Sequence, residues 1–273
     1  MKRLIILFIG LHTCLLLLAA SVDTVVVHSR SMNKSLKCVV IKPDNYKQNN
    51  LRFPVVYLLH GYEDSYNYWI KEIPSIRNGA DENQMILVCP DGSQDSWYFD
   101  SPRDSTVKIE THISKEVVEY IDATYRTIAD RSHRAITGMS MGGHGAIYIA
   151  LRHTNVFGAA GSTSGVLNII AFRDNPGLQK HIGDEVTYKA MWDSLTVIKM
   201  IEYYPADSLA LIIDCGIDDP FYRMNKRVHE KMLQLKIPHE FIEGPGAHTN
   251  EYWTNAIKYQ LLFFHRYFRT HMK

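Results

Sequence analysis

The sequence predicts an α/β fold in which a mostly parallel central sheet is covered by helices on both faces. Short apolar segments, typical of strands buried on both sides, alternate along the chain with segments whose apolar residues recur every four positions. Such alternation indicates parallel strands joined by crossover helices. A further observation is a glycine-rich turn around Ser140, which links one apolar segment directly to a helical one.

The strands are indicated by short runs of apolar and β-branched residues. The first two runs, residues 23–29 and 36–42, precede a polar stretch at 44–50. The continuous apolar run 54–59 has the character of a strand without a solvent-facing side. Further strands are expected at residues 85–89, 135–139, 157–161, 209–214 and 240–242.

Helical periodicity marks several segments between and after these strands. Apolar residues recur at every fourth position in 113–125 and 224–232, and a third pattern, 253–264, lies near the C-terminus. Residues 141–152 begin on small residues and predict a helix that starts directly after the glycine-rich turn. Residues 162–205 are longer than one crossover helix requires, so we expect a small cap over the site.

Length and composition are those of one globular domain. The chain has 273 residues, of which 46% are hydrophobic and 22% charged, and it contains no repeat, low-complexity stretch or obvious linker. We therefore assign residues 22–273 to a single domain. The formal net charge of +1 argues against a polyanionic partner such as nucleic acid.

Residues 1–21 have the pattern of a secretory signal peptide. Lys2 and Arg3 are followed by an almost wholly apolar run, 4–18, and then by small residues at 19–21. The alternative is an N-terminal membrane anchor, but this run is short for a span of about 20 residues. The sequence therefore predicts a secreted or periplasmic protein, without a stable membrane span after the signal is cleaved.

Cysteine usage indicates buried thiols rather than a metal site. Outside the signal segment the chain contains Cys38, Cys89 and Cys215, each within an apolar run. Because three is an odd number, free thiols are favoured over one disulfide plus a thiol. No Cys-x-x-Cys motif or paired His and Cys spacing indicates a metal, and we expect no cofactor.

The glycine-rich turn carries the strongest chemical signal. Residues 138–142 read Gly-Met-Ser-Met-Gly and join a predicted strand to a predicted helix. A serine at such a turn is the nucleophile elbow of an α/β-hydrolase. The turn strains the backbone of Ser140, and larger side chains at Gly138 and Gly142 would collide with the adjacent strand and helix. The helix N-terminus directs free N–H groups toward the serine oxygen. Ser140 is therefore the expected nucleophile.

A serine nucleophile needs a general base, which α/β-hydrolases provide from a histidine late in the chain. His248 lies in a turn-rich loop directly after the strand expected at 240–242. The other histidines in the last part of the chain lie in helical patterns, at a strand start or near the C-terminus. The sequence thus favours His248 as the base over His229, His239, His265 and His271.

The base in turn needs a carboxylate that orients it, and this acid is expected after the strand at 209–214. Three aspartates qualify: Asp214, Asp218 and Asp219. Asp214 still lies within the strand and is a structural candidate. Asp218 and Asp219 lie in the following loop, where either side chain can turn inward, and the residues alone leave these two equal.

An oxyanion hole needs two backbone N–H groups. Met141, directly after the nucleophile, provides the first. The second is expected from the loop after an early strand, where Gly61 permits a sharp bend and Tyr62 is the donor. His60 precedes the serine, so its expected role is to hold this loop by a hydrogen bond. His144, one helical turn beyond the nucleophile, is expected to be a packing residue.

Taken together, several segments resemble the esterase D family. They are Leu-Leu-His-Gly (58–61), Pro-Asp-Gly (90–92), Trp-Tyr-Phe-Asp-Ser-Pro (97–102), Gly-Met-Ser-Met-Gly-Gly-His-Gly-Ala (138–146), Asp-Cys-Gly-Ile-Asp-Asp (214–219) and Gly-Ala-His-Thr-Asn-Glu-Tyr-Trp (246–253). That group contains S-formylglutathione hydrolases, secreted feruloyl and acetylxylan esterases of carbohydrate esterase family 1, tributyrin esterases and antigen 85 mycolyltransferases. The resemblance spans roughly residues 36–268. One departure is Gly-Ala-His at 246–248, where relatives often have Gly-Gly-His.

The resemblance also implies which residues act. The family nucleophile falls on Ser140, the histidine on His248 and the second oxyanion donor on Tyr62. The family acid stands three residues after the glycine of the Cys-Gly motif. That position is Asp219 here, which decides between the two loop aspartates.

The implied activity is that of a secreted serine carboxylesterase. By resemblance, its substrate is a plant cell-wall ester such as feruloylated or acetylated xylan or its oligosaccharides, so the expected partner is a small-molecule or oligosaccharide ester. Trp97 and Tyr98 are candidates for stacking on an aromatic acyl group or a sugar face; alternatively, both pack under the active-site loop. Other possible functions are acyl transfer of antigen 85 type and non-catalytic carbohydrate binding on the same fold.

Overall fold

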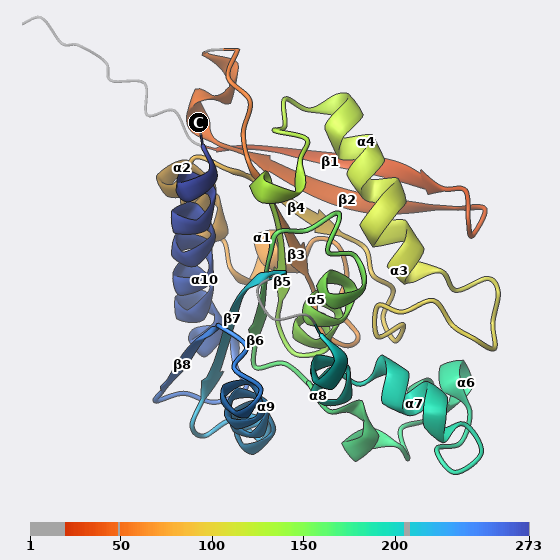
Figure 1. Ribbon diagram of the computed structural model, residues 1–273. Helices are drawn as coiled ribbons and strands as arrows, with labels where there is room; N and C mark the ends of the chain where they lie inside the picture. The colour runs from red at the N-terminus through yellow and green to blue at the C-terminus, as the bar shows by residue number, and fades with distance from the viewer. Residues whose placement is uncertain (1–19, 49, 205–207, 273) are drawn as a thin grey trace, which may run out of the picture.

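The computed structural model describes residues 20–48, 50–204 and 208–272, and within them an eight-stranded sheet forms the centre of the molecule (Figure 1). In space the strands follow the order β1-β2-β4-β3-β5-β6-β7-β8. Their bounds are β1 Ser21–Ser29, β2 Lys34–Lys42, β3 Val55–Leu59, β4 Ile86–Pro90, β5 Arg134–Gly138, β6 Ala159–Thr163, β7 Ala210–Gly216 and β8 Glu240–Gly244.

The sheet is antiparallel at one edge and parallel over the rest. β1 and β2 form an antiparallel hairpin, and β2 pairs antiparallel with β4. All pairs from β4 through β3, β5, β6 and β7 to β8 are parallel. The expected mostly parallel sheet is therefore confirmed. The carboxyl ends of these strands meet at one edge, which is where open α/β sheets bind their ligands.

Both faces of the sheet are covered, as the apolar run at 54–59 predicts. All five residues of β3 are buried, and its alternate side chains enter two separate cores. Tyr57 and Leu59 pack in the first core, whereas Val56 and Leu58 pack in the second. Since neighbouring side chains of a strand point to opposite faces, a fully apolar strand needs cover on both.

Helices provide this cover. Figure 1 shows α2 and α10 together on one side, where α10 packs against α2, β6 and β7. On the other face, α5 packs against β3, β5 and β6. The helix bounds are α1 Tyr68–Glu72, α2 Ile76–Asn83, α3 Ile109–Thr111, α4 Val118–Thr124, α5 Met141–Arg152, α6 Pro176–Ile182, α7 Lys189–Leu195, α8 Val197–Met200, α9 Tyr222–Gln234 and α10 Asn250–His271.

The expected helices are present, with one irregularity. The helix expected at 141–152 is α5, and the patterns at 224–232 and 253–264 lie within α9 and α10. The pattern at 113–125 is not one regular helix, because a π-helical stretch, His112–Val117, joins α3 to α4. The short helices α1 and α2 were not indicated by the sequence patterns.

Within the expected cap segment 162–205, the described residues 162–204 form a group of short helices instead of a single crossover helix. The group contains the 3-10 turn Ile169–Phe172 and helices α6, α7 and α8, and Figure 1 shows α6 and α7 at the periphery of the molecule. Asn175 caps α6, because its Oδ1 accepts from the N–H of Leu178. Trp192 of α7 is buried, and its indole N–H donates to the carbonyl of Gly183 at 3.1 Å. The buried side chains of the segment, Trp192 among them, extend the first core.

The expected signal segment falls outside the described residues except at its end. Ala20 is buried and its N–H donates to Asp81 Oδ2 at 3.2 Å, and Ser21 already belongs to β1. The folded part of the chain thus begins at least as early as Ala20, two residues before the expected domain boundary. In the described part of the chain, no helix is long and apolar enough to cross a membrane.

The three described cysteines, Cys38, Cys89 and Cys215, are buried and free, as expected. Cys38 and Cys89 lie on neighbouring strands, but their side chains belong to cores on opposite faces of the sheet. Burial raises the pKa of each thiol, which keeps all three protonated and unreactive at neutral pH.

Candidate active site

Ser140 lies between the end of β5 and the start of α5, in a backbone conformation that serine rarely adopts. Its φ is 57° and its ψ is −119°. The N–H of Ser140 donates to the carbonyl of Thr163 at 3.0 Å, and the carbonyl of Ser140 accepts from the N–H of His144 at 3.2 Å. The expected elbow is therefore present as a strained strand-to-helix turn.

The two glycines of this turn are required by close backbone contacts. A Cβ at Gly138 would lie 2.6 Å from the backbone of Gly142. A Cβ at Gly142 would lie 2.5 Å from the carbonyl oxygens of Leu59 and His60. Because the atoms met are backbone atoms, no rotation of a side chain relieves these collisions, and the predicted reason for both glycines is confirmed.

The side chains of Ser140, His248 and Asp219 form one hydrogen-bonded chain. Nδ1 of His248 lies 2.8 Å from Asp219 Oδ2, and Nε2 lies 3.0 Å from Ser140 Oγ. Since a carboxylate only accepts, Nδ1 carries the proton and donates it to Asp219, while Nε2 accepts from the serine hydroxyl. The other oxygen of Asp219 accepts from the N–H of Phe221 at 2.8 Å, which fixes the buried carboxylate.

The other two acid candidates lie elsewhere. Asp218 is exposed, and its N–H donates to the carbonyl of Gly246 at 2.9 Å. Asp214 lies within β7, fully buried, where its carboxylate accepts from Thr163 and Gln260. Neither carboxylate contacts His248 among the described residues, so the structure brings Asp219 alone of the three to the imidazole.

The remaining histidine candidates bond to groups other than Ser140. Nδ1 of His229 lies 2.8 Å from Nε2 of His239, next to the start of β8. His265 donates from Nδ1 to the carbonyl of Asn83, and His271 ends α10. His144 packs as expected, stacked on Tyr148 and bonded through Nε2 to the carbonyl of Leu195.

The N–H groups expected to form the oxyanion hole belong to two segments that touch beside Ser140. Met141 is the first residue of α5, where a backbone N–H has no acceptor within the helix. Tyr62 lies in the loop after β3, and the backbone of this loop at His60 packs tightly against Gly142 of α5. This contact holds the loop against the N-terminus of the helix.

Gly61 serves this loop for a reason other than the expected bend. Among the described glycines only Gly183 and Gly246 have a positive φ, so the loop does not need a left-handed residue at 61. A Cβ at Gly61 would lie 2.9 Å from Met139 Sδ and 3.1 Å from Asp64 Oδ2. The glycine therefore allows close packing of the loop against the residue before the nucleophile.

His60 holds the same loop with both of its ring nitrogens. The N–H of Gly92 donates to Nε2 at 2.9 Å, so Nδ1 carries the proton and donates to the carbonyl of Gly61 at 2.8 Å. Burial lowers the pKa of His60, which keeps the imidazole neutral in this arrangement. The expected role of His60 as a loop-holding residue is confirmed.

Tyr98 packs beneath this loop. It is fully buried, and its hydroxyl donates to the carbonyl of His60 at 2.9 Å. Its ring occupies the space beside Gly92 and Gly145, where a Cβ would lie 2.1 Å and 2.5 Å from it. The structure therefore favours the packing alternative for Tyr98 over a substrate-binding role. Trp97 is only 4% exposed, so little of its ring is accessible to a substrate.

Four aromatic side chains form a series that ends at the triad, and sequence analysis missed two of them, Phe172 and Phe221. Ring centroids are 6.3 Å apart for Tyr62 and Trp97, 6.5 Å for Trp97 and Phe172, and 5.6 Å for Phe172 and Phe221. Phe221 then meets the imidazole of His248 edge-on at 4.8 Å. We call these four residues the aromatic arc. They come from separate segments of the chain, so no local pattern marks them.

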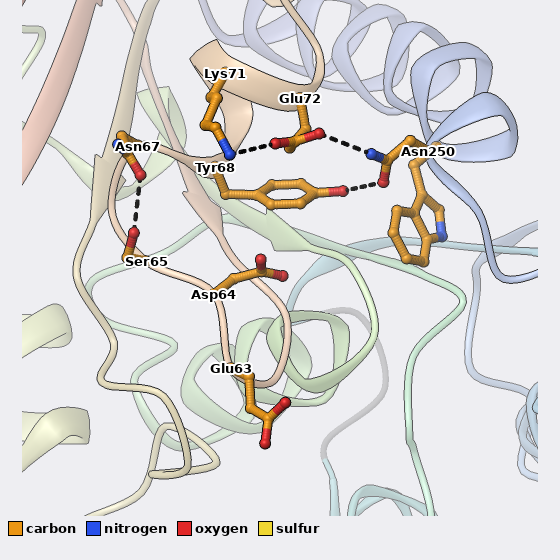
Figure 2. A pocket seen from close by; sticks show the side chains of 9 residues that line it. Glu63, Asp64, Ser65, Asn67, Tyr68, Lys71, Glu72 and Asn250 are labelled. Atoms are coloured by element: carbon orange, nitrogen blue, oxygen red, sulfur yellow. Dashed lines mark hydrogen bonds and ion pairs between the residues drawn. The ribbon is translucent and has the colours of Figure 1, made fainter.

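A cavity of about 440 Å³ lies between the loop after β3, the helix α1 and the start of α10 (Figure 2). One of its lining residues, Trp253, contacts the triad: its ring meets the imidazole of His248 edge-on, with ring centroids 4.8 Å apart. In Figure 2, Asn250 lies between two side chains of α1. Its Nδ2 donates to Glu72 at 3.2 Å, and its Oδ1 accepts from the hydroxyl of Tyr68 at 2.7 Å. The start of α10 and the helix α1 thus form one polar wall of this cavity.

Carboxylates dominate the charge of the cavity. Glu72 pairs with Lys71 at 2.9 Å, whereas Glu63 and Asp64 have neither an ion pair nor a side-chain hydrogen bond within the described ranges. Burial raises the pKa of Asp64, and the charge of Glu72 raises it further. Three carboxylates therefore face the cavity against one ammonium group, and two of them are available to a ligand.

A strained serine at the end of a central parallel strand, with an acid and then a histidine after later strands, defines an α/β-hydrolase. The chain belongs to the esterase family, because the family model "Putative esterase" matches residues 29–264.

Individual relatives agree with this family. Esterase Rv1288 of Mycobacterium tuberculosis is 29% identical over 242 residues, which are 77% of this chain and 52% of that protein, so the chain spans about half the length of this curated relative. S-formylglutathione hydrolase of Bos taurus is 23% identical, over 73% of this chain and 78% of that protein. A solved structure of a ferulic acid esterase is 28% identical, with a TM-score of 0.79 over 92% of this chain and 99% of that one.

Proposed function

We propose that this protein is a secreted serine carboxylesterase that acts through Ser140, His248 and Asp219. The observation that carries the proposal is the hydrogen-bonded chain from Asp219 through the imidazole to the serine hydroxyl, at 2.8 Å and 3.0 Å. Membership of the esterase family supports the same class of reaction. The secreted location rests on the sequence pattern of residues 1–21.

In the first half of the proposed reaction, Nε2 of His248 takes the proton of Ser140 while Oγ attacks the ester carbonyl. The oxyanion that forms is held by the N–H groups of Met141 and Tyr62, and the positive end of the α5 dipole adds to this stabilisation. Asp219 keeps the proton of the imidazole on Nδ1 and stabilises the imidazolium. The alcohol then leaves with the proton from Nε2.

In the second half, water takes the place of the alcohol. Nε2 of His248 removes a proton from this water, and the hydroxide attacks the acyl-serine carbonyl. The same two N–H groups hold the second oxyanion. Collapse of this intermediate releases the acid and returns the proton to Oγ of Ser140, so the enzyme is regenerated without a metal or cofactor.

The aromatic arc supports an aromatic acyl group such as feruloyl. Phe172 and Phe221 are half-buried, so each ring has a face or edge left for a ligand, whereas Tyr98 has none. An aromatic ring packed against another contributes about 1 kcal/mol beyond its buried area. The similarity to a ferulic acid esterase at 28% identity supports the same class of substrate.

Replacing Phe172 with alanine is expected to raise KM for methyl ferulate about fivefold, the equivalent of about 1 kcal/mol, while turnover of nitrophenyl acetate stays nearly constant. The acetyl group is too small to reach the ring, so it loses no contact. Tyr203→Ala is the matched control, because Tyr203 lies in the same segment and is 87% exposed. Steady-state kinetics on both esters test this, and equal losses on both would contradict the assignment.

The cavity beside His248 supports a neutral sugar as the alcohol. His248 donates its proton to the leaving oxygen, so the alcohol lies on the side of the imidazole. Trp253, which lines the cavity, packs against the imidazole ring. The carboxylates of Glu63 and Asp64, which also line it, can accept hydrogen bonds from sugar hydroxyls. A negatively charged leaving group such as glutathione is repelled by the same carboxylates.

The double variant Glu63→Gln/Asp64→Asn is expected to raise kcat/KM for S-acetylglutathione about fivefold relative to that for acetylated xylobiose, because each removed charge contributes on the order of 1 kcal/mol of repulsion or less. The ratio for the variant is divided by the ratio for the unchanged protein, which cancels the difference in reactivity between thioester and ester. Glu230→Gln on α9 is the control, since it removes an exposed charge outside the cavity. An unchanged ratio would show that the alcohol does not enter this cavity.

The proposed function itself is tested by a hydrolysis screen. The purified protein is offered methyl ferulate, acetylated xylan and short-chain nitrophenyl esters, and the released acids are measured. A fluorophosphonate probe, which reacts with activated serines, reports in parallel whether the nucleophile is competent. Failure to hydrolyse any ester and to react with the probe would exclude the serine esterase.

A further inference from the structure

A buried network of polar side chains joins the strands β5, β6 and β7 to the helix α10. Its centre is Asp214 of β7, whose Oδ2 accepts from Thr163 Oγ1 at 2.8 Å and from Gln260 Nε2 at 2.6 Å. Oε1 of Gln260 in turn accepts from Thr137 Oγ1 at 3.0 Å. All four side chains are buried, at no more than 1% exposure. A buried polar group costs free energy unless it is bonded, so this network depends on all of its members.

Three members lie in elements that precede or follow a triad residue in the chain. Thr137 lies in β5, three residues before Ser140. Asp214 lies in β7, five residues before Asp219. Gln260 lies in α10, the helix that begins two residues after His248.

Thr163, the fourth member, bonds directly to the elbow. Its carbonyl accepts the N–H of Ser140 at 3.0 Å, while its hydroxyl bonds Asp214. A shift of Asp214 or Gln260 is therefore transmitted to the nucleophile through one residue of β6.

The amide of Gln260 occupies space that a glycine on the neighbouring strand leaves open. A Cβ at Gly161 would lie 1.8 Å from Gln260 Oε1, so the amide reaches the network only because residue 161 has no side chain. Burial raises the pKa of Asp214 to about 6, although the hydrogen bonds from Gln260 and Thr163 lower it. Burial of a carboxyl group in these surroundings lowers the stability of the fold, so we expect a role for Asp214 other than stabilisation.

We propose that Asp214 and Gln260 are positioning residues that set the distances among Ser140, His248 and Asp219. This inference rests on the proposed esterase function. Neither residue touches the substrate. Together they tie the strand before the serine, the strand before the acid and the helix after the histidine to one another, so the triad keeps its hydrogen-bonded geometry through the reaction.

The test compares Gln260→Leu and Asp214→Leu with the unchanged protein, each at a temperature where it is folded. Both substitutions are expected to lower kcat ten- to a hundredfold with KM changed less than twofold, because a misplacement of about 1 Å costs on the order of a hundredfold in rate. The rate of fluorophosphonate reaction is expected to fall by the same factor. Asp214→Asn keeps one oxygen that can accept both bonds, so it should retain kcat within about threefold.

Two further sets of variants keep this test decisive. Thr163→Val and Thr137→Val have nearly the same shape and remove one bond each, so they replace the leucine variants if those fail to fold. Glu110→Gln is the stability control, because Glu110 bonds Tyr148 and Arg152 in a buried network outside the site. It is expected to lower the melting temperature and leave kcat unchanged.

Retention of kcat and of the fluorophosphonate rate within twofold in the folded network variants would overturn the positioning role. So would an equal fall of kcat in Glu110→Gln at a matched loss of melting temperature, since that would assign the effect to stability alone. A wild-type protein that neither hydrolyses esters nor reacts with the probe would instead refute the proposed function.

Discussion

Replacing Ser140 with alanine is expected to lower kcat for ester hydrolysis on the order of a million-fold, as loss of a serine nucleophile does in a triad hydrolase. The hydrogen-bonded chain then ends at His248, and no other hydroxyl lies within bonding distance of its Nε2 among the described residues. The residual rate comes from the oxyanion donors, which need no nucleophile. Steady-state kinetics and loss of fluorophosphonate labelling measure the effect.

The fold should survive this substitution, because Oγ of Ser140 makes no hydrogen bond other than that to His248 within the described ranges. An unchanged circular dichroism spectrum and a cooperative melt are the controls. A Ser140→Ala protein that still hydrolyses esters at a comparable rate would remove Ser140 from the reaction.

Replacing Asp219 with asparagine is expected to lower kcat about ten-thousand-fold, because only a carboxylate keeps the proton of His248 on Nδ1. Asp219 Oδ2 lies 2.8 Å from this nitrogen. An amide group there either donates to the imidazole and reverses its tautomer or leaves it unbound, and in both cases Nε2 no longer accepts the serine proton.

Asp218→Asn is the matched control for this change. Asp218 is the neighbouring residue, carries the same charge and is exposed, with a side chain that lines a cavity near β8. Its kcat should stay within about twofold of the unchanged protein, since surface charges act weakly at a distance. Equal losses at the two positions, or a larger one at Asp218, would mean that the acid is a different residue.

The central strands and the elbow could be predicted from sequence because their signals are local. The run at 54–59 is apolar at every position, so it indicates a doubly covered strand without further context. The end of β5, the serine and the start of α5 follow one another within the four residues 138–141. Likewise, a loop-holding hydrogen bond of His60 was predicted, because a histidine before the nucleophile has no place in the expected order of the triad; the second bond of its ring was not.

Strand and helix ends were less predictable, since hydrophobicity reports burial and not pairing. The apolar run expected as a strand at 157–161 begins two residues before β6, Ala159–Thr163, because Phe157 is already buried in the first core. The spacing of four at 113–125 exceeds the 3.6 residues of an α-helical turn. The segment contains the π-helical stretch His112–Val117, whereas the same spacing at 224–232 lies in the regular helix α9, so the spacing alone does not reveal a π-helix.

The short helices α1 and α2 escaped prediction because they offer too few turns for a period to appear. α1 has five residues and α2 has eight, and neither N-cap side chain bonds the helix. Their positions are fixed by tertiary contacts, as for Trp69, whose indole N–H donates to the carbonyl of Leu59 at 3.3 Å. Propensity is a weak guide where such contacts decide.

The parts of the site that join distant segments could not be derived from sequence. Phe172 and Phe221 meet across 49 positions of the chain, and Asp214 meets Gln260 across 46. Nothing in either neighbourhood distinguishes these residues from ordinary core residues. Asp214 was even a candidate for the catalytic acid, and only its place inside β7 gives it another role.

At Ser140 the residue that would make the fold most stable differs from the residue that the proposed reaction requires. A residue held at a positive φ costs about 1–3 kcal/mol, and glycine avoids most of that cost. A chain with glycine at this position would be more stable but would lack the proposed nucleophile. If selection acted on stability alone, a substitution that relieves this backbone strain would be favoured, and the product would be an inactive protein with the same fold. The fold alone gives no reason for a serine in so unfavourable a conformation, whereas the role of nucleophile proposed for Ser140 does.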